Sequence, residues 1–430
     1  MIPVIETKST AEIREFQENK LSNLLEYLNT NSPFYREKFL KEKIDIRKIN
    51  TLEHLKSISF TSKEDLQLRN HDFICVSPNK IIDYITTSGT LGDPVTFAAT
   101  ENDLERLAYN EAISFACAGA NSNDIYQLMV TLDRRFMAGL AYFMGLRKLG
   151  AGIVRSGPGN PELQFDTLKR INPTAFVTVP SFLIKLIEYA ENKGVDINAT
   201  TVKSAVCIGE PIRNNDFTYN KLGKQITDKW NIKLFSTYAS TEMGAAFSEC
   251  TFGCGCHHHP ELLIVELLDE HGNDVEPGTP GEVVITTLGV EGMPLLRFKT
   301  GDICIHDTEP CKCGRNTIRL GPVIGRKKQM IKYKGTTLYP PSLYDILNDL
   351  HEVENYVVEV STNQMDTDEI LIKIGVNNPD ELLEKKIKDH FRAKLRVAPS
   401  IAFLLPAEIA KLQFPESARK PMLFFDKRIR

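Results

Sequence analysis

Apolar residues repeat in two ways along this chain, and each pattern predicts a different kind of element. Over 11–28 they recur at helical spacing, which predicts an amphipathic helix with one buried side (Ile13, Phe16, Leu21, Leu24 and Leu28). From about residue 80, β-prone runs alternate with helical stretches, which predicts a parallel sheet covered by helices. We expect strands at 81–86, 125–131, 176–179, 205–208 and 232–235, with helices at 101–118 and 136–149.

The pattern changes near residue 260. Runs at 262–268 and 282–287 flank a polar turn at 271–274, which predicts consecutive antiparallel strands. Farther along we expect helices at 341–350 and 380–394 and strands at 354–361, 370–375 and 400–405. The prediction is an α/β fold. A large N-terminal domain (1–325) has helix-covered sheets and an antiparallel β portion, and a small α+β C-terminal domain covers 326–430.

Charge and hydropathy exclude several classes of protein. The chain has 430 residues, with 52 basic and 56 acidic side chains and a net charge of −4, so we expect no general attraction to nucleic acid or anionic membranes. The longest apolar run, 136–146, is too short to cross a bilayer. The first residues lack a basic segment followed by an apolar one, so we expect no signal peptide and a cytoplasmic protein.

The nine cysteines are unevenly placed. Four stand singly in apolar surroundings and are expected to be small buried hydrophobes (Cys75, Cys117, Cys207 and Cys304). The other five fall in two tight groups, 250–259 and 311–313, and the first group ends in three histidines. Thiolates and imidazoles in two short groups suit tetrahedral Zn²⁺, and a structural role is expected.

These groups offer more ligands than the four that zinc takes. We expect Cys250, His257, Cys311 and Cys313 to bind the metal, with Cys256 as the main substitute. The roles of Cys254, His258 and His259 stay open.

A loop rich in Ser, Thr and Gly follows the predicted strand at 81–86. Its sequence is Thr86-Thr87-Ser88-Gly89-Thr90-Leu91-Gly92-Asp93-Pro94. Backbone N–H groups and hydroxyls in such a turn can converge on phosphate oxygens. The loop lacks the Gly-Lys-Ser/Thr ending of a Walker loop.

Five further motifs follow in order. They are Gly209-Glu210-Pro211, Tyr238-Ala239-Ser240-Thr241-Glu242, Arg297-Phe298-Lys299-Thr300-Gly301-Asp302, Gly325-Arg326 with Ile331-Lys332-Tyr333-Lys334-Gly335, and Ser417-Ala418-Arg419-Lys420. Together they resemble the adenylate-forming superfamily of acyl-CoA synthetases over about residues 10–430. Within it the chain is most similar to the phenylacetate–CoA ligases, through Gly-Glu-Pro, Thr286-Thr287-Leu288 and Tyr339-Pro340.

The resemblance implies a role for each motif in binding ATP and Mg²⁺. Thr87, Ser88, Gly89 and Thr90 would cradle the phosphates, although Asp93 stands where a lysine is common in the family. The adenine would lie against Gly209, Glu210 and Pro211 and the strand Tyr238-Ala239-Ser240, with Tyr238 stacked on the base. Thr241 would touch the α-phosphate and Glu242 would bind Mg²⁺. Asp302 would accept hydrogen bonds from the ribose hydroxyls, Arg326 would lie near ribose and phosphate, and Lys420 would be the catalytic lysine of adenylation.

The resemblance also implies the reaction. An aryl carboxylate, phenylacetate first, would attack the α-phosphorus of ATP, pyrophosphate would leave, and coenzyme A would then take the acyl group from acyl-AMP. The C-terminal domain would move about a hinge near 326–329 between these steps. The family habit would be a homodimer. The alternatives are another aryl acid (indoleacetate or aminobenzoate), a coenzyme F390 synthetase-like adenylyltransferase, and a non-catalytic nucleotide-binding protein.

Overall fold

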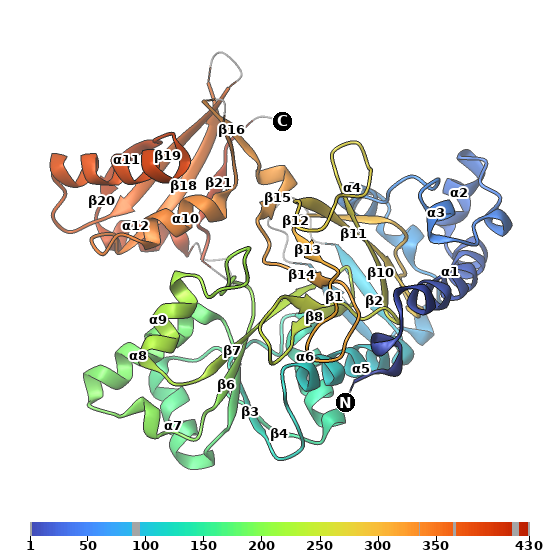
Figure 1. The fold of residues 1–430 in the computed structure, drawn as a ribbon, viewed down its shortest axis with the longest axis horizontal. Coiled ribbons are helices and arrows are strands. Elements are labelled where there is room, and N and C mark those ends of the chain that lie inside the picture. Colours follow the sequence, from blue (N-terminus) through green and yellow to red (C-terminus); the bar gives the residue numbers. More distant parts are fainter. Residues whose placement is uncertain (1, 88–94, 335, 364–366, 415–420, 429–430) are drawn as a thin grey trace. The chain divides into compact units, whose positions relative to one another are not determined.

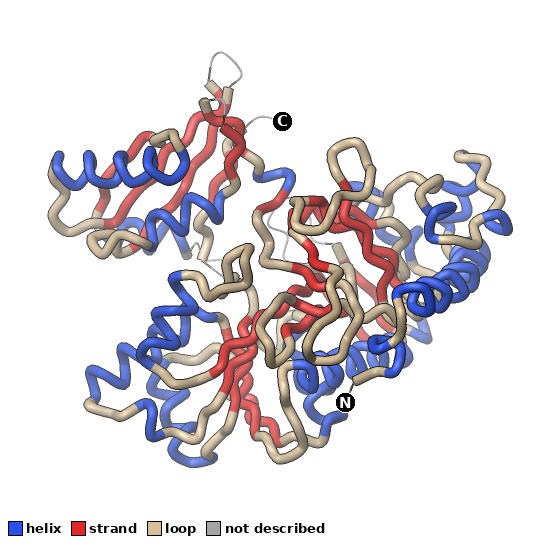
Figure 2. Tube along the Cα trace, in the orientation of Figure 1, coloured by secondary structure: helices blue, strands red, loops and turns tan. Residues whose placement is uncertain are grey.

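The computed structural model describes residues 2–87, 95–334, 336–363, 367–414 and 421–428. The chain divides into two compact units, which we describe separately. The first unit comprises Met1–Thr300 and Cys304–Pro322, and the second comprises Gly301–Ile303 and Val323–Arg430. Figure 1 labels the elements, and Figure 2 separates helices from strands.

The first unit begins with helices. The predicted amphipathic helix is α1 (Thr10–Asn31), which opens with a capping box between Ser9 and Glu12. Its apolar side, including Leu21 and Leu28, is buried. Short helices follow in the order α2 (Pro33–Lys41), α3 (Leu52–Leu55) and α4 (Lys63–Leu68).

A nine-stranded sheet forms the centre of the first unit, in the order β13-β14-β9-β8-β7-β6-β5-β3-β4. Its parallel part confirms the predicted alternation of strands and helices. The parallel strands are β3 (Ile125–Leu128), β4 (Gly152–Arg155), β5 (Ala175–Thr178), β6 (Ser204–Cys207) and the first half of β7 (Lys233–Ser240).

Helices cover both faces of this parallel part, as the continuous apolar runs in the strands require. On one face Phe176, Ala205 and Leu234 pack in one apolar cluster with α7 (Pro161–Ile171), α8 (Pro180–Lys193) and α9 (Lys221–Lys229). On the other face Val206 and Phe235 pack with α5 (Glu101–Cys117) and α6 (Met137–Leu149). As predicted, α6 ends at Gly150, whose φ of 83° is left-handed.

Antiparallel strands complete the first unit. The second half of β7 pairs with β8 (Ala245–Glu249), and the sheet continues through β9 (Cys256–His257), β14 (Arg319–Leu320) and β13 (His306–Asp307). The predicted antiparallel pair is confirmed as β10 (Leu263–Leu268) and β11 (Gly281–Thr287). Strands β1 (Asp83–Thr86) and β2 (Thr96–Ala99) flank the Ser/Thr/Gly loop. Strand β12 (Phe298–Cys304) continues into the second unit.

The second unit is a small α/β domain, and the predicted fold class is confirmed. Its sheet has the order β20-β19-β18-β21, with an antiparallel central pair and parallel outer pairs. These strands are β18 (Asn355–Thr362), β19 (Asp368–Gly375), β20 (Ser400–Leu404) and β21 (Phe424–Asp426). The helices are α10 (Pro340–Asn348), α11 (Glu381–Leu395) and α12 (Pro406–Gln413). A hairpin of β16 (Ile331–Tyr333) and β17 (Thr336–Leu338) precedes them, and β15 (Gly325–Arg326) pairs with the end of β12.

Across the described ranges, no helix has both the length and the apolar character that crossing a bilayer requires.

Candidate active site and metal centre

The Ser/Thr/Gly loop begins where β1 ends. Thr87 is buried and closes the base of the loop, since its N–H donates to the Val95 carbonyl (3.0 Å) and its hydroxyl accepts from the Val95 N–H (3.1 Å). The Thr86 N–H donates to the carbonyl of Arg135 (3.2 Å). The other predicted phosphate-binding residues of this loop, Ser88, Gly89 and Thr90, lie outside the described residues.

The Gly-Glu-Pro motif follows β6 and is held by side chains on both sides. Gly209 has a φ of +76°, which favours glycine. The Glu210 carboxylate accepts from the Ser181 N–H (2.9 Å) and hydroxyl (3.0 Å), so it caps the first turn of α8. The Asn220 amide donates to the Pro211 carbonyl (2.9 Å). Residues 209–213, which we call the adenine loop after the role predicted for them, are therefore fastened to α8 and to the residue that caps α9.

The predicted Tyr238–Glu242 motif occupies the end of β7 and the turn into β8. Tyr238 is buried, and its ring centroid lies 5.6 Å from that of Phe247 on β8. Ala239 pairs with Ala246, and Ser240 accepts the N–H of Met243 (3.3 Å). Thr241 and Glu242 line a small pocket with apolar residues of β2, α5 and α6.

Lys63 lies beside this turn and was not found from the sequence. It is the first residue of α4, and its Nζ is 3.9 Å from Glu242 Oε1. The Ser62-x-x-Asp65 capping box marks the start of the helix, but no spacing in the sequence connects residue 63 with residue 242. A lysine therefore stands next to the acidic residue of the motif, while the sequence of the Ser/Thr/Gly loop includes Asp93.

Arg106 on α5 ties this turn to two other loops. Its guanidinium donates to the carbonyls of Gly244 (2.6 Å), Leu262 (2.7 Å) and Leu288 (2.7 Å). Burial lowers the pKa of Arg106 to about 10, so it remains charged at neutral pH. The backbone that follows Thr241 and Glu242 is thus held by charge-assisted hydrogen bonds.

Three predicted residues belong to the second unit, and the structure describes two of them. Asp302 on β12 is buried and accepts a hydrogen bond from Arg326 Nε on β15 (3.2 Å). The two residues are also directly opposite in the strand pairing. The predicted catalytic residue Lys420 lies outside the described residues.

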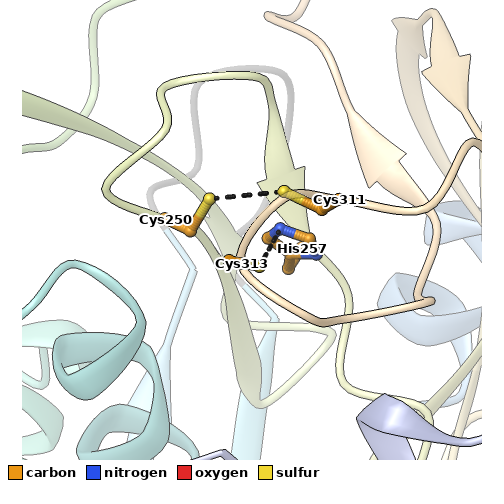
Figure 3. Close-up of side chains that lie close together, drawn as sticks. All are labelled: Cys250, His257, Cys311 and Cys313. Carbon is orange, nitrogen blue, oxygen red and sulfur yellow. Dashed lines mark hydrogen bonds between the residues drawn. The ribbon is translucent and has the colours of Figure 1, made fainter.

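Four of the predicted zinc ligands come together. The ligand atoms of Cys250, His257, Cys311 and Cys313 all lie within 4.8 Å of one another (Figure 3). Cys250 follows β8, His257 is on β9, and the other two lie in the turn after β13. The Cys250 and Cys311 sulfurs are 3.7 Å apart, and Cys313 Sγ is 3.5 Å from His257 Nε2.

The remaining candidates differ in position. Cys256 Sγ contacts the carbonyl of Ser236 (3.5 Å), His258 packs beside Phe247, and the ring of His259 contacts Glu6 and Ser114. Of Cys254, Cys256, His258 and His259, Cys254 is the one that lies beside the cluster, with its Sγ 3.5 Å from Cys311 Sγ.

The donor set fits zinc. Zinc–sulfur bonds of about 2.3 Å and zinc–nitrogen bonds of about 2.0–2.1 Å give tetrahedral edges of roughly 3.8 Å (S–S) and 3.5 Å (S–N). The two distances above lie near these values. Thr317 Oγ1 lies 2.9 Å from His257 Nδ1, which leaves Nε2 facing the thiols. Arg315 donates to Cys313 Sγ (3.5 Å) and to the buried Glu6 carboxylate (2.6 Å), so a positive charge stands beside the sulfur.

Comparison with known proteins identifies the family. Residues 11–292 match the family described as AMP-binding enzyme, and the chain belongs to this family. It is thus an enzyme of the AMP-forming acid–thiol ligase superfamily, as the ordered motifs predicted.

Relatives cover most of the chain. A phenylacetate-coenzyme A ligase of Thermus thermophilus is 29% identical over 92% of this chain and 94% of its own. One from Escherichia coli is 26% identical over 83% and 81%. The crystal structure of 2-hydroxyisobutyryl-CoA ligase in the postadenylation state with R3-HIB-AMP has a TM-score of 0.84 and 20% identity, covering 98% of this chain and 91% of that one. This last similarity shows the fold.

The contacts of Arg106 generate a prediction about stability. Arg106→Met keeps most of the volume but removes three hydrogen bonds to largely buried carbonyls, each worth about 1.5–3 kcal/mol. We expect the thermal unfolding temperature to fall by about 5 °C or more. Arg170→Met, which removes an exposed ion pair with Asp166, is the matched control. An unchanged unfolding temperature for Arg106→Met would show that water replaces the lost donors.

Proposed function

We propose that the protein activates an aryl carboxylic acid, phenylacetate first, as acyl-AMP and transfers the acyl group to coenzyme A. The observation that carries this proposal is the ordered set of motifs on the AMP-binding fold. Its acidic turn at Glu242 and its adenine loop both follow strands of one sheet. Phenylacetate is preferred because the relatives at 24–29% identity over most of the chain are named phenylacetate-coenzyme A ligases.

The reaction has two steps. The substrate carboxylate attacks the α-phosphorus of ATP and pyrophosphate leaves, after which the thiol of coenzyme A attacks the acyl carbonyl and AMP leaves. No protein nucleophile is required, so catalysis consists of positioning and of neutralising charge on phosphate oxygens. Thr87, with Ser88, Gly89 and Thr90, would bind the phosphates. Tyr238 would stack on the adenine, and Asp302 and Arg326 would bind near the ribose.

Several groups would bind the phosphates or neutralise their charge. Thr241 would donate to the α-phosphate, and Glu242 would hold Mg²⁺, which neutralises charge on phosphate oxygens. Lys63, beside Glu242, would supply a charge that the phosphate loop lacks at Asp93. Lys420 would act in adenylation.

The substrate class is tested by pyrophosphate release. We expect release with phenylacetate and its hydroxylated relatives, and thioester formation only when coenzyme A is added. Indoleacetate, aminobenzoate and aliphatic acids such as 2-hydroxyisobutyrate complete the panel. Release with aliphatic acids alone would overturn the aryl assignment, and release only with a hydroxylated cofactor would favour adenylyl transfer. No release under any condition would favour a non-catalytic nucleotide-binding protein.

The role of Lys63 is tested by Lys63→Met. Losing one charge-assisted contact of about 1.5 kcal/mol or more should raise KM for ATP about tenfold. The KM for the acid should change little, because the lost charge faces the phosphates. Lys48→Met, which removes an exposed lysine of the same unit, is the control. Equal KM values for ATP in Lys63→Met and wild type would restrict Lys63 to its ion pair with Glu242.

We also propose that Cys250, His257, Cys311 and Cys313 bind a structural Zn²⁺. Elemental analysis of protein purified without a histidine tag should find about one zinc per chain. Cys313→Ser should lose most of the metal and unfold at lower temperature, because structural zinc contributes folding energy. Cys207→Ser changes a buried thiol outside the cluster and should keep its zinc. Metal-free wild-type protein would contradict the proposal.

A further inference from the structure

A buried ion pair connects the adenine loop with the segment that leads into the proposed metal cluster (Cys250, His257, Cys311 and Cys313). Arg213 Nε is 2.5 Å from Glu249 Oε1. The Glu249 side chain is fully buried, and that of Arg213 is 11% exposed. Buried pairs of this kind do not by themselves stabilise a fold, but removing one partner leaves an uncompensated charge. Fold stability alone therefore does not explain why an ion pair is buried at this position.

Arg213 is the last residue of the adenine loop and is held from several directions. Its Nη1 donates to the Phe217 carbonyl (2.8 Å), and its guanidinium lies 4.3 Å from the ring centroid of Tyr219. Its backbone forms an isolated bridge with Tyr219. Asn220, which follows Tyr219 in the chain, donates to the Pro211 carbonyl. The orientation of Arg213 and the path of the adenine loop are consequently linked.

Glu249 connects the same pair to two other parts of the unit. Its Oε2 accepts the N–H of Ser236 on β7, two residues before Tyr238 (3.2 Å). It also immediately precedes the metal-cluster residue Cys250. A single carboxylate thus contacts the strand that carries Tyr238 and the loop that carries the adenine motif, and it adjoins the metal cluster.

The loop between Cys250 and Cys256, called the cysteine loop hereafter, also packs directly on Arg213. Gly253 has a φ of +66°, and a Cβ placed there would lie 2.5 Å from Arg213 Nη2. The loop between Cys250 and Cys256 therefore passes close against the guanidinium. If this loop moved, Arg213 would lose one of the walls that hold it against Glu249.

We propose that Arg213 and Glu249 are positioning residues that set the adenine loop against β7, and that the metal-bound cysteine loop keeps this pair in register. The inference rests on the proposed nucleotide and zinc sites and deepens both. In this arrangement the metal acts on the shape of the base pocket rather than on the reacting atoms. Its loss would weaken nucleotide binding and base selectivity before it affected recognition of the acid.

The pair is tested first in the zinc-loaded enzyme. Glu249→Gln is close in shape but leaves Arg213 without its charge partner. We expect KM for ATP to rise between about ten- and a hundredfold, as expected for a misplaced binding group. The preference for ATP over GTP, as a ratio of kcat/KM, should fall, while KM values for the acid and coenzyme A stay unchanged. A general loss of folding would not produce this selective change.

Two further variants keep this test decisive. Glu191→Gln breaks an exposed ion pair with Lys229 in the same unit and should change neither KM nor base preference. Arg213→Lys keeps the charge but not the planar fork, so it should give an intermediate loss of base preference even if Glu249→Gln fails to fold. An unchanged ATP/GTP ratio in folded Arg213→Lys would overturn the inference, whatever its zinc content.

The contribution of the metal is tested by removing it with a chelator. Wild-type enzyme without zinc should show the raised KM and reduced base preference of Glu249→Gln, and zinc addition should restore both. Removing zinc from Glu249→Gln should cause little further change, because both changes act on one pair. Fully additive effects would overturn the coupling. Protein that never contained metal would contradict the zinc proposal alone, since the Glu249→Gln result would still decide the role of the pair.

Discussion

Strand β7 is the element to which both halves of the large sheet attach. Its first half, Lys233–Ser236, pairs in parallel with β6, and its second half, Thr237–Ser240, pairs antiparallel with β8. At the changeover, side chains bond the backbone of Ser236: the Glu249 carboxylate accepts its N–H, and the Cys256 thiol contacts its carbonyl. Buried backbone groups need such partners. Glu249 is therefore buried next to the sheet, and Arg213 forms the ion pair that balances its charge.

The order of strands in this sheet places two of the predicted nucleotide motifs on adjacent strands. A ligand crevice in an open α/β sheet forms beyond the carboxyl ends of parallel strands. The Gly-Glu-Pro loop follows β6 and the Tyr238–Glu242 turn follows β7, which is the next strand of the sheet, so these two predicted motifs lie on neighbouring strands. Arg106 and Lys63 then fix this turn from helices that lie far from it in the sequence.

Sequence patterns predicted β3, β5, β6 and the first half of β7 because strands buried on both faces appear as short apolar runs between helical stretches. They missed the parallel strand β4, and the predicted strand at 81–86 belongs to an antiparallel pair instead. They also singled out the four residues that the structure brings together, Cys250, His257, Cys311 and Cys313, since two short groups of thiols and imidazoles suit a metal site. The extension of β7 to Ser240 was missed because Ser236 and Thr237 look like a polar strand end. Strand β8 was missed because its sequence, Ala245-Ala246-Phe247-Ser248-Glu249, has no β-branched residue and ends in two polar ones. Lys63, Arg106 and the Arg213–Glu249 pair could not be predicted, because each depends on a contact between distant segments and has no characteristic spacing.

The distance along the chain between the two halves of the cysteine cluster has a consequence for biosynthesis. His257 and Cys313, which lie 3.5 Å apart in the folded unit, are separated by 56 residues. At about 5–20 residues per second, a ribosome needs roughly 3 to 11 s to add that stretch. During this interval Cys250 and His257, two of the four proposed zinc ligands, have been made, while Cys311 and Cys313 have not. The proposed zinc site is therefore completed only after the turn that carries Cys311 and Cys313 has been made.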